Sequence, residues 1–262
     1  ENQSSLLSAA KFDQNYNSQY SYIAKVGYPM GMMYGFIYEG TYKYEDFDKV
    51  GDTYTLKRNV PYFSSESNTQ PGMPKYADLN GDGIIDDNDR TMIGNGMPKH
   101  TGGFTNNFEY KGFDLSIFFQ WSYGNDVLNA NRLFFENSNK TRDLNQYASY
   151  ANRWTPENPE SNIPRATDSG SNKVFSTRII EDGSFLRLKT VSLGYTLPKQ
   201  LTKKWKIDNA RVFVAGQNLW TCTGYSGYDP EVSIREGALT PGLDFSAYPR
   251  AYSISFGINL GF

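Results

Sequence analysis

The sequence of 262 residues is poor in the side chains that build most active sites and metal centres. It holds one cysteine, Cys222, which excludes an internal disulfide and a cysteine-rich metal site. It holds one histidine, His100, which excludes a zinc site of several histidines and disfavours histidine-dependent catalysis. His100 has no carboxylate beside it in sequence, so we expect a surface residue. No nucleophile elbow, phosphate-binding glycine loop or zinc motif is present. We therefore predict that the chain is not an enzyme and has no catalytic residues.

An excess of one charge and long apolar runs are lacking too. The formal net charge is −2, with 26 Lys and Arg against 28 Asp and Glu, so no nucleic-acid partner is indicated. No stretch approaches the roughly 18 apolar residues of a membrane helix, and the mean hydropathy is −0.61. A membrane β-barrel shows neither feature of a membrane helix, because its lipid-facing residues alternate with polar ones and its loops are polar. Low hydropathy therefore does not exclude a membrane protein.

Aromatic residues are abundant instead, with 20 Tyr, 17 Phe and 4 Trp. The stretch 252–262, YSISFGINLGF, places an aromatic or aliphatic residue at every second position, and 113–123, FDLSIFFQWSY, does so except for the extra Phe118. This alternation predicts strands with one apolar face, of about the 9–11 residues that a tilted membrane strand needs. Further strands are predicted at 103–110, 185–197, 210–221, 31–39 and 19–26, with a hairpin at 110–112. The total is about six to eight strands.

The connections between the predicted strands alternate in length. Residues 40–100, 124–184 and 223–249 are long and polar, whereas 110–112 and 198–209 are short. A membrane barrel has long loops on one side and short turns on the other, and counting back from the last strand places every long connection on the same side. We interpret the lysines of 198–209 as a solvated periplasmic face. A soluble β-sandwich also alternates apolar and polar residues, so it remains the alternative fold.

Residues 78–89, DLNGDGIIDDND, concentrate acidic and amide side chains in one short loop. A calcium loop of the EF-hand type takes oxygen ligands at positions 1, 3, 5, 7, 9 and 12, with glycine at position 6. Placing position 1 at Asp78 fills the ligand positions with Asp78, Asn80, Asp82, Ile84 (through its backbone carbonyl), Asp86 and Asp89. Gly83 then falls at the bend, and Ile85 at position 8 is expected to turn inward. We predict that this loop binds calcium and that the metal stiffens a long connection.

Two features depart from an EF-hand. Position 12 is Asp89 rather than glutamate, as in dockerin-type loops, and its shorter side chain reaches less easily for bidentate binding. No helix precedes Asp78, because Pro71, Gly72 and Pro74 stand there, so a conformational sensor is not expected. The alternative interpretation is a pair of Asn-Gly and Asp-Gly turns on a solvated loop. A glycosidase would need two facing carboxylates, and the calcium spacing explains the adjacent acids better.

Seven blocks of the sequence carry a family resemblance. They are 76–95 (YADLNGDGIIDDNDRTMIGN), 98–126, 153–159 (RWTPENP), 181–198, 211–221, 226–232 and 248–262. In this order and at these intervals they resemble the C-terminal part of SusC/RagA-type TonB-dependent outer-membrane transporters, as found in Bacteroidetes. The resemblance spans about residues 28–262.

The resemblance implies an all-β fold, formed by the C-terminal strands of a large antiparallel transmembrane β-barrel with long extracellular loops and short periplasmic turns. Residues 1–262 would be the C-terminal portion of this barrel, without the plug domain and the N-terminal strands. Residues 78–89 would lie within an extracellular loop. The sequence begins ENQSS, without an initiator Met, and shows neither plug nor TonB box, so we expect a piece of a longer protein.

The implied function is active import of oligosaccharides or peptides across the bacterial outer membrane. The implied partners are a SusD-like surface lipoprotein, the remaining N-terminal barrel and plug, TonB through the missing N-terminal part, the glycan or peptide cargo, and outer-membrane lipid. The alternative is a soluble calcium-binding surface module that binds glycans. Phe262 fits the aromatic C-terminal residue of outer-membrane barrels as well as an ordinary lipid-facing position. In the outer loops, Trp154, Tyr225 and Tyr228 either stack on sugar rings or pack loops together.

Overall fold

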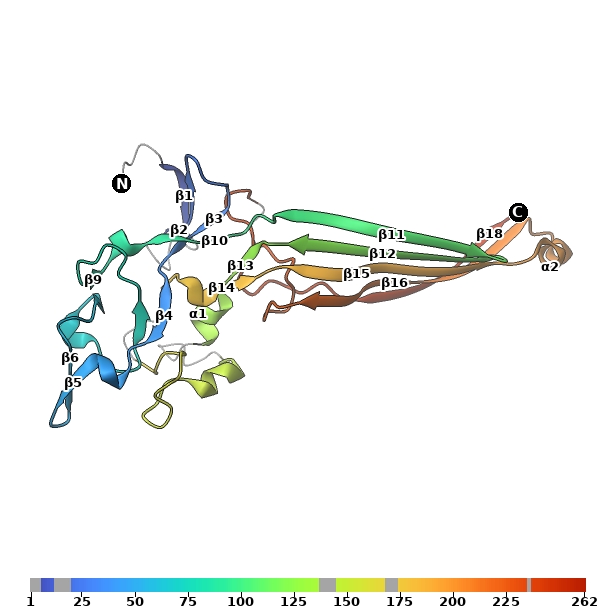
Figure 1. Ribbon diagram of the computed structural model, residues 1–262. Coiled ribbons are helices and arrows are strands. Elements are labelled where there is room, and N and C mark those ends of the chain that lie inside the picture. Colours follow the sequence, from blue (N-terminus) through green and yellow to red (C-terminus); the bar gives the residue numbers. More distant parts are fainter. Residues whose placement is uncertain (1–5, 12–19, 137–144, 168–173, 235–236) are drawn as a thin grey trace. The chain divides into compact units, whose positions relative to one another are not determined.

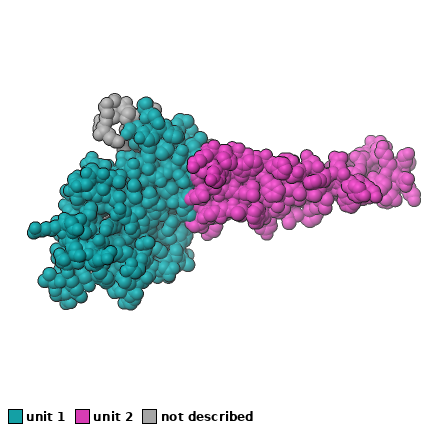
Figure 2. Space-filling model, in the orientation of Figure 1, with its two compact units in different colours: residues 1–97, 126–181, 233–247 teal, residues 98–125, 182–232, 248–262 magenta. Residues whose placement is uncertain are grey.

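The computed structural model is built mostly of strands (Figure 1) and describes residues 6–11, 20–136, 145–167, 174–234 and 237–262. The chain divides into two compact units (Figure 2). Unit 1 comprises Glu1–Met97, Asp126–Glu181 and Ser233–Ala247, and unit 2 comprises Pro98–Asn125, Asp182–Val232 and Tyr248–Phe262. Unit 1 therefore holds most of the three long connections, and unit 2 holds the longest strands and the short connections.

Unit 2 is built on one antiparallel sheet of five strands, in the order β11-β12-β15-β16-β18. The strands are β11 His100–Tyr110, β12 Phe113–Tyr123, β15 Phe185–Thr196, β16 Asn209–Thr223 and β18 Ser253–Gly261. Each matches a strand that alternation predicted, with ends that differ by three residues or fewer. The connection between β15 and β16 holds the helix α2 Lys199–Thr202 and a 3-10 helix Lys203–Trp205.

The register places apolar residues of neighbouring strands on one face of this sheet. Directly opposed residues of an antiparallel pair share a face. Two rows across the sheet are Phe104, Phe119 and Leu188, and Leu193, Val214 and Phe256. The other face carries small and polar residues, such as the row Ser116, Ser192, Ala215 and Ser255, with Phe118 as the predicted exception. The apolar face is largely exposed, and Phe256 reaches 81%.

Both short connections leave this sheet at one end, and the long ones join it at the other. Tyr110 pairs with Phe113 across the turn Lys111-Gly112, whose φ angles of 48° and 88° suit a two-residue hairpin. At the opposite end His100 pairs with Tyr123, where the segment before β11 and the connection after β12 meet the sheet. Phe185 pairs with Thr223 at that same end. The predicted one-sided arrangement of long connections is therefore confirmed.

Unit 1 contains shorter strands formed by the long connections. Its four-stranded sheet has the order β1-β2-β3-β10, with β1 Leu6–Lys11, β2 Tyr20–Lys25, β3 Met32–Gly35 and β10 Thr91–Asn95. A three-stranded sheet has the order β14-β13-β17, with β13 Asp126–Asn129, β14 Ile180–Asp182 and β17 Leu243–Asp244. Three strand pairs join β4 Tyr38–Thr41 to β8 Pro74–Tyr76, β5 Phe47–Val50 to β6 Thr53–Leu56, and β7 Tyr62–Phe63 to β9 Ile84–Ile85.

In the described part of unit 1 the helices are short. They are α1 Asn131–Phe135 and the 3-10 helices Tyr44–Asp46, Glu66–Asn68, Asp87–Asp89, Ala148–Asn152 and Thr177–Ile179. Across the residues that the structure describes, none of the helices has both the length and the apolar character to span a membrane.

The core of unit 1 draws on all the long segments of the chain. Its largest cluster of buried residues is Tyr22, Met33, Leu128, Ala130, Leu133, Phe175, Ile179 and Leu243. Within it β13 pairs in parallel with β17 through Leu128 and Leu243. The connections 124–184 and 223–249, although polar in sequence, therefore share an apolar core with Tyr22 and Met33.

The prediction of one strand at 31–39 is wrong, because the strand breaks between Gly35 and Tyr38. The backbone N–H of Phe36 donates to the Phe175 carbonyl at 2.9 Å, and the ring of Phe36 is 1% exposed. A side chain at Gly35 would collide with the same carbonyl, at 2.3 Å from its Cβ. This contact with a distant segment overrides the local alternation. The strand predicted at 19–26 is confirmed as β2, except that residue 19 lies outside the described part. β2 and β3 belong to the four-stranded sheet of unit 1 and β4 pairs with β8, so none of them joins the five-stranded sheet.

Candidate metal-binding loop and buried charge networks

Residues 78–89 connect β8 to β10 in unit 1 and wrap tightly through hydrogen bonds from backbone to side chains. Asp78 Oδ1 accepts from the N–H of Gly81 at 2.7 Å, and its Oδ2 accepts from the N–H of Gly83 at 2.8 Å. Gly81 and Gly83 have φ angles of 76° and 84°, which glycine adopts without strain. The bend that the calcium spacing places at Gly83 is therefore present.

The middle of the loop continues the same pattern. Asn80 Oδ1 accepts from the N–H of Asp82 at 2.9 Å, and Asp82 Oδ1 accepts from the N–H of Ile84 at 2.9 Å. Asn80 Nδ2 also donates to Asp82 Oδ2 at 2.9 Å. Side chains spaced two residues apart each cap the following turn, as Asn and Asp commonly do.

Asp89 closes the loop from its far end. Its side chain is wholly buried, and its Oδ1 accepts from the N–H groups of Leu79 at 2.8 Å and Asn80 at 3.3 Å. Its Oδ2 accepts from the N–H of Asp86 at 2.8 Å, while Asp86 Oδ1 accepts from Asn88 at 2.8 Å. A single carboxylate therefore joins the start of the loop to its last turn.

The inward turn predicted for Ile85 is confirmed. Ile85 is 1% exposed and packs in a buried cluster with Phe36, Tyr76 and Val174. Its strand β9 pairs in parallel with β7. Ile84 points the other way and is 43% exposed. The apolar residue thus anchors the acidic loop to the core of unit 1.

The side-chain oxygens of residues 78–89 have the type and spacing that suit calcium. In the structure these oxygens accept hydrogen bonds from backbone N–H groups. In the described residues, no group of three or more His, Cys, Asp or Glu side chains is placed to hold a metal ion. Calcium takes six to eight oxygens at 2.3–2.6 Å, and Asp78, Asp82, Asp86 and Asp89 accept backbone N–H groups instead. Each carboxylate has about four lone-pair sites, so a carboxylate that accepts one to three N–H groups still has a site for a cation. Calcium binding stays a prediction.

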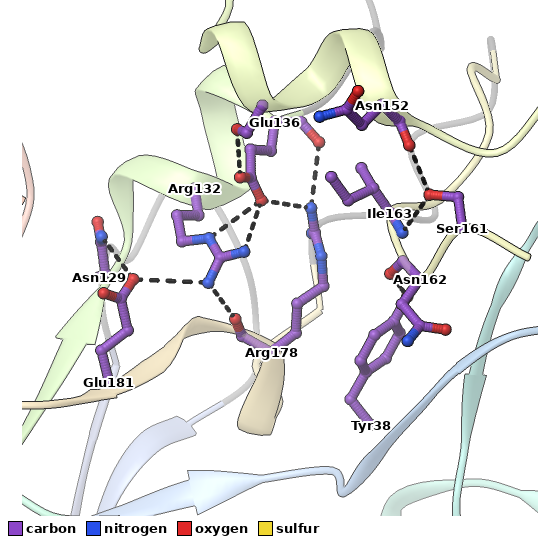
Figure 3. A network of polar contacts seen from close by, with 11 residues as sticks. Tyr38, Asn129, Arg132, Glu136, Asn152, Ser161, Asn162, Ile163, Arg178 and Glu181 are labelled. Atoms are coloured by element: carbon purple, nitrogen blue, oxygen red, sulfur yellow. Dashed lines mark hydrogen bonds and ion pairs between the residues drawn. The ribbon is translucent and has the colours of Figure 1, made fainter. Parts of the chain in front are cut away.

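A buried carboxylate joins two arginines elsewhere in unit 1 (Figure 3). Glu136 Oε2 lies 3.0 Å from Arg132 Nη2 and 2.8 Å from Arg178 Nη2. Ser149 Oγ donates to Glu136 Oε1 at 2.7 Å, and Arg132 Nη1 lies 3.5 Å from Glu181 Oε1. The network ties α1 to two 3-10 helices from distant parts of the chain. The i,i+4 spacing of Arg132 and Glu136 is a sequence signal for their pairing, whereas nothing in the sequence pattern marked Arg178 or Glu181 as partners.

Contacts with the segment 152–163 are drawn in the same view (Figure 3). Tyr38 Oη donates to the Asn162 carbonyl at 2.7 Å, and Ser161 Oγ donates to the Asn152 carbonyl at 2.6 Å. Trp154 is buried, with its ring centroid 5.5 Å from that of Tyr44. Trp154 of the block RWTPENP is thus packed within unit 1, whereas Pro156, Glu157 and Asn158 are exposed.

Unit 2 holds a second buried network, which centres on Arg187 of β15. Its Nη2 lies 2.5 Å from Asp229 Oδ1 and its Nη1 lies 3.2 Å from Glu231 Oε2, while Arg250 Nη1 is 2.9 Å from the same Glu231 oxygen. Burial alone raises the pKa of Asp229. Hydrogen bonds from the Glu231 N–H and from Arg187 outweigh burial and hold that pKa below its usual value. The network pins the connection after β16 to the sheet.

Several known proteins are similar to this chain along most of its length. No family model matches the chain. The chain is 35% identical over 247 residues to TonB-dependent receptor P3 of Formosa agariphila. The aligned region covers 92% of this chain and 23% of that protein. It is 27% identical over 198 residues to TonB-dependent receptor SusC of Bacteroides thetaiotaomicron. That aligned region covers 75% of this chain and 18% of that protein.

The fold agrees with these sequence relatives. A solved structure described as the RagAB peptide transporter matches with a TM-score of 0.69 and 27% identity, over 92% of this chain and 24% of that chain. The chain resembles the C-terminal part of a SusC/RagA-type TonB-dependent transporter. The predicted resemblance and the all-β fold class are therefore confirmed. The chain spans about a quarter of the length of TonB-dependent receptor P3 and of the matched RagAB chain. The relatives are named as receptors and transporters, which agrees with a protein that is not an enzyme.

The individually predicted residues take different positions in this SusC/RagA-like fold. Trp154 and Tyr225 are buried, as residues that pack loops are, whereas Tyr228 is 86% exposed. His100 is exposed, as expected, and its Nδ1 accepts a hydrogen bond from Trp121 Nε1 at 3.2 Å. Of the three aromatic residues considered for sugar stacking, Tyr228 alone presents its ring to solvent.

Proposed function

We propose that the chain contributes strands and outer loops to a transporter that imports oligosaccharides or peptides across the bacterial outer membrane. The exposed apolar face of the five-stranded sheet supports this proposal most directly. In a bilayer that face would meet lipid, and the opposite face of small and polar residues would line the barrel interior. Strands such as β12, with 11 residues, have about the length that a tilted membrane strand needs. The long connections, including residues 78–89, would then form the extracellular loops.

The edges of the sheet support the proposed need for further strands. β11 and β18 are its outermost strands, and an unpaired edge in lipid would leave backbone N–H and C=O groups without partners. The N-terminal barrel strands of the whole protein would pair with these edges, and its plug would fill the interior. TonB would act through that N-terminal part, and a SusD-like lipoprotein would cover the extracellular loops.

Fractionation of the native protein tests the location. The full-length protein should stay in the outer-membrane fraction after high-salt washing and dissolve only with detergent. Protease added to intact cells should cut within the long connections and spare the turn Lys111-Gly112. Release of a folded, monomeric protein without detergent would instead favour the soluble glycan-binding module.

Cargo class is a separate question with its own experiment. The relative described as a peptide transporter supports peptides, and the family resemblance keeps oligosaccharides beside them. A strain that lacks the transporter should lose growth on one of these two cargo classes at limiting concentration. Normal uptake of both classes by that strain would contradict the proposed import function.

We also propose that residues 78–89 bind calcium and that the metal braces the loop. Side-chain oxygen donors at the required spacing and the bend at Gly83 support this. The double substitution Asp78→Ala and Asp82→Ala should abolish calcium binding, measured by titration calorimetry on the full-length protein. The matched control replaces Asp48 and Asp52, which are exposed acids on the hairpin of β5 and β6. Equal calcium binding in both variants, or none in the unmodified protein, would leave two tight turns as the explanation.

A further inference from the structure

The short connection between β15 and β16 combines positive charge with exposed apolar side chains. We name residues 198–208 the basic turn. Its lysines, all exposed, are Lys199, Lys203, Lys204 and Lys206. Trp205 is 65% exposed and Leu201 is 48% exposed. Lysines are expected on a turn that faces water, but an exposed tryptophan is not. Solvation alone therefore does not explain why lysines and apolar side chains stand together here.

Hydrogen bonds hold the basic turn in a defined shape. Leu197 N–H donates to the Ala210 carbonyl at 2.9 Å, and Asp208 N–H donates to the Gly261 carbonyl of β18 at 2.8 Å. Thr202 is 1% exposed, and its carbonyl accepts from the N–H of Ile207 at 3.2 Å. The two short helical segments are therefore fixed against the end of the sheet, and their outward residues form a lasting surface.

The charge of this surface is not neutralised within the turn. Within the residues that the structure describes, none of its four lysines forms an ion pair, and Asp208 is the one acid in residues 198–208. The neighbouring turn at the same end of the sheet adds Lys111, which lies 5.1 Å over the ring of Tyr110. The lysines are thus available to an external anion.

The apolar face of the sheet continues to this same end. Figure 1 shows α2 and the C-terminus at that end of the five strands. Val212 and Leu260 share the apolar face through the register, and Phe262 beyond them is 86% exposed. A surface with aromatic and basic residues directly beyond an apolar band matches the boundary between lipid tails and headgroups, where tryptophan is enriched and lysines reach outward.

We propose that the basic turn binds the headgroups of anionic phospholipids in the membrane leaflet on the short-turn side of the sheet. This inference rests on the proposed function, because it requires the sheet to span a bilayer. Each lysine near an anionic surface is expected to strengthen the attraction by about fivefold. Trp205 and Leu201 would insert among the upper acyl chains, and the four ammonium groups would contact phosphate oxygens.

Lipid retention by the full-length protein tests this assignment. The purified transporter is incubated in detergent with phosphatidylglycerol or with zwitterionic phosphatidylethanolamine, and native mass spectrometry counts the lipids that remain bound. The Lys203→Gln and Lys204→Gln double variant should retain phosphatidylglycerol at least tenfold more weakly. The matched control, Lys49→Gln and Lys99→Gln, replaces two exposed lysines outside the basic turn and should behave as the unmodified protein. Trp205→Ala should weaken retention of both lipids.

The outcomes separate this inference from the proposed function. Equal phosphatidylglycerol retention by the two double variants would overturn the lipid assignment, as would an acidic protein co-purifying through the basic turn in its place. Either result leaves the outer-membrane location standing if the protein still fractionates with the membrane. Heat-modifiable migration on a gel confirms that each variant has folded. If the Gln pair fails this control, Lys203→Arg and Lys204→Arg should fold and keep full retention, and loss of retention there would also overturn the assignment.

Discussion

Units 1 and 2 draw on the same pool of aromatic and aliphatic residues and place them in opposite ways. Unit 1 buries them inside itself, so that Tyr22, Met33 and Phe36 are at most 1% exposed. Unit 2 collects them on one face of a sheet, where Phe256 and Ile258 are 81% and 67% exposed. The two units differ in the number of their sheets. Unit 1 folds several small sheets onto one another, and unit 2 has a single sheet. One unit supplies its own apolar environment, and the other depends on an external one.

Removal of a core ring should have a large effect on unit 1. Phe36→Ala is expected to cost about 3–5 kcal/mol of folding free energy, because Phe63 and Tyr76 lose their packing partner. The measurement is the rate of limited proteolysis within the long connections of the full-length protein. Val50→Ala, at a position 73% exposed, is the control and should change little. Equal cleavage of the two variants would contradict a core in unit 1.

In unit 2 the substitution with the largest expected effect removes the buried positive charge of Arg187. Arg187→Ala should cost about 3–5 kcal/mol, because it leaves the buried carboxylate of Asp229 without its cation. Hydrogen exchange should rise in the segment around residues 225–232. Lys189→Ala is the control, since the Lys189 Nζ lies 3.9 Å from Glu231 and contributes a weaker contact. If both substitutions raise exchange equally, Arg187 does not pin this connection.

The two faces of the five-stranded sheet can be compared by moving one charge across it. Ile117→Lys places an ammonium on the apolar face near the middle of β12, and we expect a loss of about 2–4 kcal/mol in a bilayer. Ser116→Lys places the same group on the polar face and should be tolerated. The readout is the yield of heat-modifiable protein in the outer membrane. A larger defect from Ser116→Lys would reverse the assignment of the two faces.

The smallest expected effect concerns the acidic loop. Asp89→Ala removes the acceptor for the N–H groups of Leu79 and Asp86, at an expected cost of about 1–3 kcal/mol. Amide exchange of these two groups should speed up in calcium-free buffer. Asp87→Ala, which removes an exposed carboxylate 3.9 Å from Arg90, should leave exchange unchanged. No change from Asp89→Ala would mean that the loop is held by other contacts.

Alternation predicted unit 2 well and unit 1 poorly, for a physical reason. Each strand of unit 2 has one face that meets a single environment, so period two survives along its full length, as in 113–123. In unit 1 contacts with distant segments decide the local structure. Phe36 turns into the core because its backbone N–H donates to the Phe175 carbonyl. Nothing near residue 36 in the sequence predicts that partner. The strands β8 and β10, which pair with β4 and β3, were missed for the same reason, whereas β5 and β6 form a local hairpin that the alternation analysis overlooked.

The acidic loop shows a similar division. Its local features could be predicted, since the bend at Gly83 and the inward turn of Ile85 depend on spacing alone. The burial of Asp89 against three backbone N–H groups could not, because it depends on how the loop closes. The pairs Arg178–Glu136 and Arg187–Asp229 were missed because their members are widely separated in the chain.

The hydroxyl of Tyr22 donates to the carbonyl of Pro241 at 3.1 Å, across 219 residues of sequence. Contacts of such separation form slowly, because the entropy of closing the intervening chain must be overcome first. During synthesis the residues near Tyr22 emerge long before their partner does. The core of unit 1 is therefore complete only when the segment around Pro241 has reached Tyr22.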